Sequence, residues 1–240
     1  MLKTVTLILP ATDEPESLKK TVEQCIAILT HYELEFVIVT SPKLTTAGCR
    51  AAIIELQRVY GGRIETFDQK EPGLGCAIRE ALERADGDVT VIMSADLETD
   101  PAALPAMLQK IEEGYDIAVT SRWRGGVHFR GYSPVKLILN FGFQQLFRLL
   151  YWTRLSDLTY AYRAYRTEIL KKIRWEEAKF PFLFESIVKP LRLGYRVAEV
   201  RAPWSARVEG ASHNSFTQTL DYTRVGLSVR FQNKKSMLVR

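Results

Sequence analysis

The first half of the chain alternates short strand-like runs with helical patterns, and this alternation constrains the fold more than any other feature. Five runs of strand length occur before residue 121, at 4–9, 35–40, 63–67, 89–93 and 116–120. Between them, apolar residues recur at helical spacing, as Leu18, Val22 and Ile26 do after the first run. Strands that alternate with helices predict an α/β fold with a doubly wound, mainly parallel sheet.

Length and composition place the chain among ordinary globular proteins. Its 240 residues, 46% hydrophobic and 25% charged, suffice for one large α/β domain with a substantial core. The three cysteines Cys25, Cys49 and Cys76 lack CxxC spacing, which favours reduced thiols in a cytoplasmic compartment over a disulfide framework or a zinc site. We expect neither a signal peptide nor a transmembrane helix, since no stretch has 18 consecutive apolar residues.

The charge balance indicates anionic partners. A formal net charge of +5 favours nucleotide diphosphates, anionic lipid surfaces or nucleic acid, and does not choose among them. The basic residues form no recognisable nucleic-acid motif, so we expect no nucleic-acid partner. We predict one domain over residues 1–220 and a basic extension over residues 221–240, which has no acid after Asp221. This extension is either a solvated end or a segment attracted to anionic lipid.

Three acidic residues follow the predicted strand 89–93, namely Asp96, Glu98 and Asp100. Asp100 precedes Pro101, which is a typical start of a helix, with an N-cap side chain and proline at the first helical position. Ligands of open α/β sheets bind beyond the carboxyl ends of the strands, so Asp96 and Glu98 predict a hard divalent cation and a phosphate bound with it. The alternative is that they cap the next helix and face water.

The second half contains a strongly apolar and aromatic segment, 135–152, with a narrower polar stripe. The stripe consists of Lys136, Asn140, Gln144, Gln145 and Arg148. Such a helix fits the core or a dimer interface, or it lies on a bilayer or holds a lipid chain. The segment 157–166 alternates aromatic and basic residues and predicts a strand or loop that lines a site. The segment 180–193 is predicted helical, with Pro190 ending or kinking it.

Taken in order, these segments resemble the family 2 glycosyltransferases, specifically the dolichol-phosphate mannosyltransferase-like (polyprenyl-phosphate glycosyltransferase) branch. The similar motifs are LPATDE at 9–14, GLG at 73–75, GDV and ADLE within 87–98, SRWRGG at 121–126, DLTYAYR at 157–163, and segments 193–200 and 207–213. The resemblance covers nearly the whole chain. It implies a GT-A type nucleotide-diphospho-sugar transferase fold and inversion at the anomeric carbon by a single displacement.

The resemblance also implies roles for particular residues. The nucleotide-sugar-binding group is Pro10, Thr12, Asp13, Glu14, Thr40, Gly73, Gly75, Ser94 and Ala95, although Gly73 and Gly75 also fit a plain helix-entry turn. The catalytic group is Asp96, Arg122, Asp157 and Arg163. The acceptor-phosphate group is Arg122, Arg207, Ser212 and His213, with ordinary ion pairs as the alternative for the arginines. Asp96 and Glu98 are the expected ligands of Mg²⁺ or Mn²⁺.

The chain departs from the family pattern at five places, the first of which is Asp13, where the family has an Asn. Thr40 and Ser41 stand where the family has an Asp pair that holds the base and ribose, so we expect base recognition to differ. Ser94 replaces the first Asp of the metal motif, which leaves one carboxylate fewer for a cation. Leu74 replaces a basic residue, and His213 replaces a lysine.

The resemblance implies a metal-assisted, inverting hexosyltransferase that moves a sugar from a nucleoside diphosphate sugar to a polyprenyl phosphate. We expect it to lie on the cytoplasmic face of a membrane, through 135–152 and the basic tail, and to serve cell-envelope or glycan biosynthesis. A phosphate monoester is anionic near neutral pH, with a second pKa of about 6, so it can attack without a protein base.

Two other functions remain open at this point. A soluble glycosyltransferase with a hydroxyl acceptor would need a base, and Asp157 is the candidate. A non-catalytic, degenerate nucleotide-sugar-binding subunit would explain Ser94 and the missing Asp pair. A homodimer or a membrane-protein partner is a further option for the apolar segment 135–152.

Overall fold

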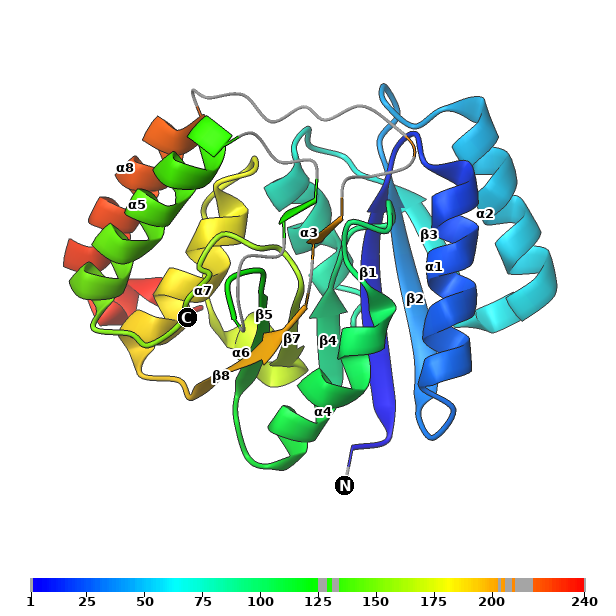
Figure 1. Ribbon diagram of the computed structural model, residues 1–240. Helices are drawn as coiled ribbons and strands as arrows, with labels where there is room; N and C mark the ends of the chain where they lie inside the picture. The colour runs from blue at the N-terminus through cyan, green and yellow to red at the C-terminus, as the bar shows by residue number, and fades with distance from the viewer. Residues whose placement is uncertain are drawn as a thin grey trace.

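A seven-stranded sheet forms the centre of the computed structural model, which describes residues 2–124, 129–130, 134–202, 204–205, 209 and 218–239 (Figure 1). The strand order is β3-β2-β1-β4-β7-β5-β8. The strands are β1 (Thr4–Ala11), β2 (Glu33–Thr40), β3 (Ile64–Asp68), β4 (Val89–Ile92), β5 (Ile117–Ser121), β7 (Arg163–Arg166) and β8 (Val197–Arg201). Only β7 runs antiparallel to its neighbours in this sheet. The predicted doubly wound, mainly parallel sheet is confirmed.

Helices cover both faces of this sheet. The helices are α1 (Pro15–Ile28), α2 (Ala47–Tyr60), α3 (Leu74–Leu82), α4 (Leu104–Glu112), α5 (Pro134–Tyr151), α6 (Thr167–Lys172), α7 (Phe182–Leu193) and α8 (Gln218–Phe231). Short 3₁₀ turns lie at Gly61–Arg63, Pro101–Ala103 and Lys234–Met237, and β6 (Phe129–Arg130) pairs with β9 (Trp204–Ser205).

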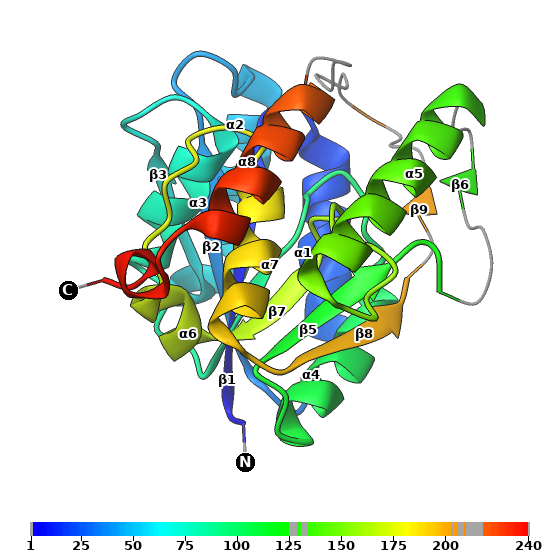
Figure 2. The same ribbon diagram turned by 90° about the vertical axis from the view of Figure 1, so that its left-hand side faces the viewer.

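Two separate apolar clusters make up the core, one on each face of the sheet. The first joins the sheet to α1, α2 and α4, and the second joins it to α3, α5, α6, α7 and α8. Strand side chains alternate between the two faces, so Leu7 and Leu9 of β1 enter the first cluster while Ile8 enters the second. Figure 2 shows α5, α7 and α8 together on the second face.

One predicted helix start is confirmed, and one helix continues past its predicted break. Asp100 accepts a hydrogen bond from the Ala102 backbone N–H at 2.9 Å and caps the turn before α4, as predicted. Pro190 lies inside α7 rather than ending it, and the helix continues to Gly194, which adopts φ +95°. Proline has no N–H for the carbonyl of Ser186 four residues earlier, and that carbonyl instead accepts a hydrogen bond from the Tyr165 hydroxyl at 3.0 Å.

The C-terminal segment packs against the body of the protein. The predicted boundary between residues 220 and 221 falls inside α8, and Val225 and Val229 of this helix are buried in the second cluster. Gly226 lets α8 approach α5 closely, because a Cβ at this position would overlap the Phe147 ring. Tyr151 of α5 also donates a hydrogen bond to the Gly226 carbonyl at 2.7 Å.

Candidate active site

The candidate site lies at the carboxyl ends of β1, β2, β4 and β5, where five loops meet. This is the edge at which open α/β sheets bind ligands. Four of the loops follow these strands, and the fifth, 156–160, precedes β7, which enters the sheet from the same edge because it is antiparallel. Tyr160 links two of the loops, since its hydroxyl donates to the Glu98 carbonyl at 2.8 Å.

Glu14 shapes the first loop from within. Its carboxylate accepts hydrogen bonds from the backbone N–H groups of Thr12 at 2.7 Å and Asp13 at 2.8 Å. Glu14 is buried, whereas Asp13 beside it is exposed, and Pro10 is half-buried at the end of β1. The structure therefore gives Glu14 a bracing role in the loop, and its contact with a nucleotide sugar stays a prediction.

The end of β2 contains two charged neighbours that the sequence analysis did not select. Thr40 is buried, and its hydroxyl donates to Asp68 Oδ1 at 2.8 Å. Arg50 of α2 forms an ion pair with the same carboxylate, with 2.7 Å between Nη2 and Oδ1. The position of Asp68 in the sequence could have predicted this contact, because Asp68 ends β3, which pairs in parallel with β2.

The glycines of the turn before α3 are explained by contacts inside the protein. Gly73 adopts φ +115°, and a Cβ on it would overlap the carbonyl oxygen of Ala178. A Cβ on Gly75 would overlap the carbonyl oxygen of Glu177. The Cys76 backbone N–H also donates to the Ala178 carbonyl at 3.1 Å. The close approach here is to the chain itself, and nucleotide contacts of Gly73 and Gly75 stay predictions.

Asp96 is held by a tight turn after β4. Its Oδ1 accepts a hydrogen bond from Ser94 Oγ at 2.5 Å and another from the Glu98 backbone N–H at 3.0 Å. Leu97 between them adopts φ +60°, a left-handed conformation that is costly for a leucine. Ala95 is buried at the start of this turn and accepts a hydrogen bond from Thr21 Oγ1 at 3.5 Å. Strain of this kind is typical of functional sites.

The donor set at this turn fits a magnesium-like ion with few protein ligands. Among the described residues, no group of three or more His, Cys, Asp and Glu side chains could hold a metal ion. Asp96 and the neighbouring Ser94 and Glu98 offer only oxygen atoms, which Mg²⁺ and Mn²⁺ prefer. An ion here would complete its coordination with water or substrate phosphates.

Arg122 and Asp157 form a buried, two-pronged ion pair beside this turn. Arg122 Nε lies 2.7 Å from Asp157 Oδ2, and Nη2 lies 2.9 Å from Oδ1. The Arg122 guanidinium also stacks over the Tyr160 ring at 4.8 Å. Burial alone raises the pKa of Asp157, but the charge and hydrogen bonds of Arg122 outweigh it, so the pKa lies below its ordinary value. A carboxylate held this way is a poor general base.

Gln144 and Glu199 brace the same loop, and the sequence analysis gave neither a site role. The Gln144 side chain donates to Thr159 Oγ1 at 2.9 Å and accepts from the Leu158 backbone N–H at 2.8 Å. Glu199 of β8 accepts from the backbone N–H groups of Ser156 at 2.6 Å and Asp157 at 3.1 Å. Burial raises the pKa of Glu199. Gln144 belongs to the predicted polar stripe of 135–152, and this stripe was the sequence feature from which its role could have been inferred.

Arg163 occupies a different environment from the one predicted for a phosphate ligand. It is fully buried, and its guanidinium donates to Ser186 Oγ at 2.6 Å, the Leu158 carbonyl at 2.9 Å and the Leu183 carbonyl. The aromatic and basic alternation of 157–166 resembles an exposed strand, but β7 is a central strand that helices cover on both faces. In the structure Arg163 ties the site loop to α7, and its predicted catalytic role stays a prediction.

The predicted acceptor-phosphate residues Arg207, Ser212 and His213 lie outside the described residues, and their role stays a prediction. Glu209 lies between them in the sequence and is described. Its carboxylate accepts a hydrogen bond from the Ser17 backbone N–H at 2.8 Å, in the first turn of α1. This contact brings the chain at residue 209 close to the first loop of the candidate site.

Comparisons with known proteins agree with this geometry. A family model described as glycosyl transferase family 2 matches residues 6–174. The chain is 26% identical over 224 residues to a dolichol-phosphate mannosyltransferase of Pyrococcus furiosus, covering 92% of this chain and 62% of that protein. It is 30% identical over 153 residues to a dolichyl-phosphate hexose transferase of Haloferax volcanii, covering 64% of this chain and 65% of that protein. The chain spans less than two thirds of the length of these relatives.

Solved structures confirm the fold class. Glucosyl-3-phosphoglycerate synthase from Mycobacterium tuberculosis, in complex with Mn²⁺, UDP and phosphoglyceric acid, superposes with a TM-score of 0.71. The sequences are 15% identical, and the match covers 96% of this chain and 80% of that one. A complex of that enzyme with Mg²⁺ and UDP gives a TM-score of 0.69 at 17% identity and covers 95% and 79% of the two chains. At these identities the likeness shows the GT-A fold alone.

Proposed function

This chain belongs to glycosyl transferase family 2, and on that premise we propose that it transfers a hexose from a nucleoside diphosphate sugar to a polyprenyl phosphate. Its curated relatives include proteins named for transfer to dolichyl phosphate. The observation that carries the proposal is the position of α5. This helix presents an apolar face to the outside, and from its inner side Gln144 reaches the loop that holds Asp157.

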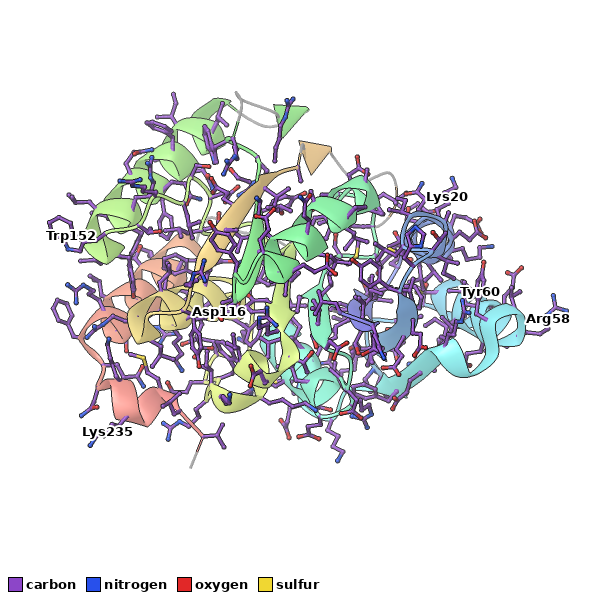
Figure 3. All side chains as sticks on the ribbon, turned by 90° about the horizontal axis from the view of Figure 1, so that it is seen from below. Lys20, Arg58, Tyr60, Asp116, Trp152 and Lys235 are labelled. Atoms are coloured by element: carbon purple, nitrogen blue, oxygen red, sulfur yellow. The ribbon has the colours of Figure 1, made fainter. Side chains whose placement is uncertain are left out.

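The outer face of α5 suits a lipid surface. Ile138 and Leu149 are 72% and 70% exposed and share one side of the helix by their spacing, and Trp152, the residue that follows the helix, is 84% exposed. Figure 3 shows Trp152 at the outer edge of the molecule, pointing away from its body. An apolar helix face of this kind, at a surface that also carries basic residues, is typical of helices that lie in the membrane interface.

α8 extends this surface. Leu220, Leu227 and Phe231 are exposed and recur at positions i, i+7 and i+11, so they share one side of α8. Lys234 and Lys235 follow the helix, where positive charge favours anionic lipid headgroups. Within the described residues, every helix falls short of the length and apolar character that a membrane span requires. We therefore propose peripheral contact, on the cytoplasmic face, through α5 and α8.

In the proposed reaction, an oxygen of the acceptor phosphate attacks the anomeric carbon while the bond from that carbon to the donor diphosphate breaks. The nucleoside diphosphate leaves, and the configuration inverts. Asp96 would hold a Mg²⁺ or Mn²⁺ ion, which stabilises the charge that develops on the leaving diphosphate. Asp157 fixes the orientation of Arg122, and Arg122 would attract the acceptor phosphate.

The state of Asp157 favours a phosphate acceptor over a hydroxyl acceptor. A hydroxyl acceptor needs a base that takes up a proton in the transition state. The Arg122 pair lowers the pKa of Asp157 and occupies both of its oxygens. A polyprenyl phosphate needs no such base, because it is already ionised near neutral pH.

The test is a transfer assay with a panel of nucleotide sugars, a short polyprenyl phosphate, and Mg²⁺ or Mn²⁺. We expect a lipid-linked sugar with at least one donor. Tight nucleotide binding without turnover for any donor would instead identify a non-catalytic nucleotide-sugar-binding subunit.

A further inference from the structure

The edge of the sheet beyond β2 and β3 contains a polar cluster in the place where the family's Asp pair is missing. β2 and β3 pair in parallel, with Thr40 directly opposite Asp68. Both residues end their strands, so their side chains meet at the ligand-binding edge. The Thr40 hydroxyl donates to Asp68 Oδ1 at 2.8 Å, which places a carboxylate from β3 beside the end of β2.

Arg50 completes this cluster from α2. Its Nη2 lies 2.7 Å from Asp68 Oδ1, its Nη1 lies 3.4 Å from Oδ2, and Nη2 also contacts the Ser41 carbonyl at 3.4 Å. The side chains of Arg50 and Asp68 are 39% and 46% exposed, so a ligand can reach both. Hydrogen bonds from Arg50 and Thr40 lower the pKa of Asp68 and keep it an ionised acceptor.

Asp68 retains capacity for one more donor. An ionised carboxylate has about four lone-pair sites. Among the described residues, Thr40 and Arg50 donate to Oδ1, and Oδ2 receives the longer contact from Arg50 Nη1. A hydrogen-bond donor of a ligand can therefore bind at Oδ2 while the Arg50 pair stays intact.

The cluster is fixed relative to the first loop of the site. Thr45 Oγ1 accepts from the Ser41 backbone N–H at 2.7 Å and donates to the Ala11 carbonyl at 2.8 Å. The Thr46 backbone N–H donates to the Thr12 carbonyl at 2.8 Å, and Thr46 caps α2, the helix that carries Arg50. The end of β1 and the Arg50–Asp68 pair thus form one connected surface.

The strand order places this surface at the nucleoside end of a donor. β3 and β4 are separated by β2 and β1, so three strand spacings, about 14 Å, lie between Asp68 and the Asp96 turn. The diphosphate belongs at the Asp96 turn, and an extended nucleoside diphosphate can reach from there across β1 and β2. β7 lies on the other side of β4. The Arg122–Asp157 pair is next to β7, and the acceptor belongs beside this pair.

We propose that Asp68, with Arg50, recognises the nucleobase of the donor. Asp68 Oδ2 accepts a hydrogen bond from a ring N–H of the base, and Arg50 donates to the carbonyl oxygen beside it. This pattern fits uracil or guanine, whereas adenine and cytosine lack a ring N–H on their pairing edge. The proposal rests on the proposed function and assigns the recognition that the missing Asp pair would otherwise supply.

The experiment measures binding by calorimetry with Mn²⁺ present, using UDP, GDP, ADP, CDP and pyrophosphate. We expect wild-type protein to prefer UDP or GDP, and Asp68→Asn to weaken that nucleotide roughly tenfold, because a hydrogen bond to a charged group is lost. Binding of pyrophosphate should not change. Glu65→Gln is the matched control, since Glu65 lies on the same strand and also pairs with an arginine, Arg84, at 3.0 Å.

Several outcomes would overturn the proposal. Equal nucleotide affinity of wild type and Asp68→Asn removes Asp68 from recognition while the proposed function stands. An equal loss for pyrophosphate shows a structural role. Wild-type protein that binds none of the five ligands refutes the proposed function, and this inference with it. Arg50→Lys is the second variant, which keeps Asp68 ionised and should also reduce the base preference.

Discussion

Two acidic residues of the site, Asp96 and Asp157, differ in how far along the chain their partners lie. Asp96 accepts hydrogen bonds from partners two residues away on either side, Ser94 and Glu98. Asp157 accepts local hydrogen bonds too, but it is also held by Arg122, 35 residues earlier, and by Gln144, 13 residues earlier. Local contacts shape a turn that can present a carboxylate to an ion. Long-range contacts build a rigid platform, so we assign ion binding to Asp96 and positioning to Asp157.

The largest expected effect comes from removing the carboxylate of the turn. Asp96→Ala should lower the transfer rate by roughly 10³-fold, because the ion that stabilises the leaving diphosphate loses its protein ligand. The fold should stay intact, although the buried turn loses the acceptor of Ser94 Oγ and the Glu98 backbone N–H, at a cost of about 1–3 kcal/mol. Asp100→Ala is the control, because it removes a nearby acid that caps a turn. It should cost about 1 kcal/mol of stability and leave transfer intact.

Removing the platform carboxylate should act on stability as well as on transfer. Asp157→Ala leaves Arg122 buried without its partner, which costs about 3–5 kcal/mol for a buried pair. Urea unfolding measures this change. A double variant with Arg122→Ala should lose less than the sum of the two single losses. Purely additive losses would show that the ion pair contributes nothing as a unit.

The same pair predicts a pH dependence with a definite sign. The pKa of Asp157 is lowered in the folded protein, so its contribution to stability is complete above the unfolded pKa of about 3.9. The contribution is lost as the pH falls through the lower, folded pKa. Below pH 4, wild-type protein should therefore lose more stability than Asp157→Asn does. Parallel pH profiles of the two proteins would contradict the assignment.

A smaller effect is expected from the brace on α5. Gln144→Leu leaves the Leu158 backbone N–H without its acceptor, at a cost of about 1–3 kcal/mol. The loop should loosen, and the KM for the acceptor should rise more than kcat falls. Gln145→Leu is the matched control, because its side chain is exposed on the same helix. Equal effects of the two substitutions on the acceptor KM would show that they act through the helix in general and not through the Gln144 contacts.

The smallest expected effect is on the affinity of the Asp96 turn for a metal ion. Ser94→Asp adds a second carboxylate beside Asp96 and restores the family's metal motif. We expect tighter binding of Mn²⁺ in the presence of a nucleoside diphosphate, by roughly tenfold, because the ion gains a charged oxygen ligand. Unchanged Mn²⁺ affinity in calorimetry would place the ion away from residue 94.

The difference between the two regions also explains what could be predicted from the sequence. Strand and helix periodicity predicted the sheet, and the acidic run after β4 indicated where to expect ion-binding carboxylates, because both inferences depend on neighbours in the chain. The ion-binding role of these carboxylates stays a prediction. The partners of Asp157 come from α5, β5 and β8, and no local pattern indicates that they meet. The burial of Arg163 could not be predicted for the same reason, since it depends on β7 entering the sheet between β4 and β5.

The central claim is that the acceptor is a polyprenyl phosphate, and a comparison of two acceptors tests it most directly. The rates of sugar transfer to a short polyprenyl phosphate and to the matching polyprenol are measured with the same donor and Mn²⁺, from pH 6 to pH 9. We predict transfer to the polyprenyl phosphate alone. Because Asp157 stays ionised from pH 6 to pH 9, the transfer rate should not fall across this range. Transfer to the polyprenol at a comparable rate would contradict the account and identify a hydroxyl acceptor.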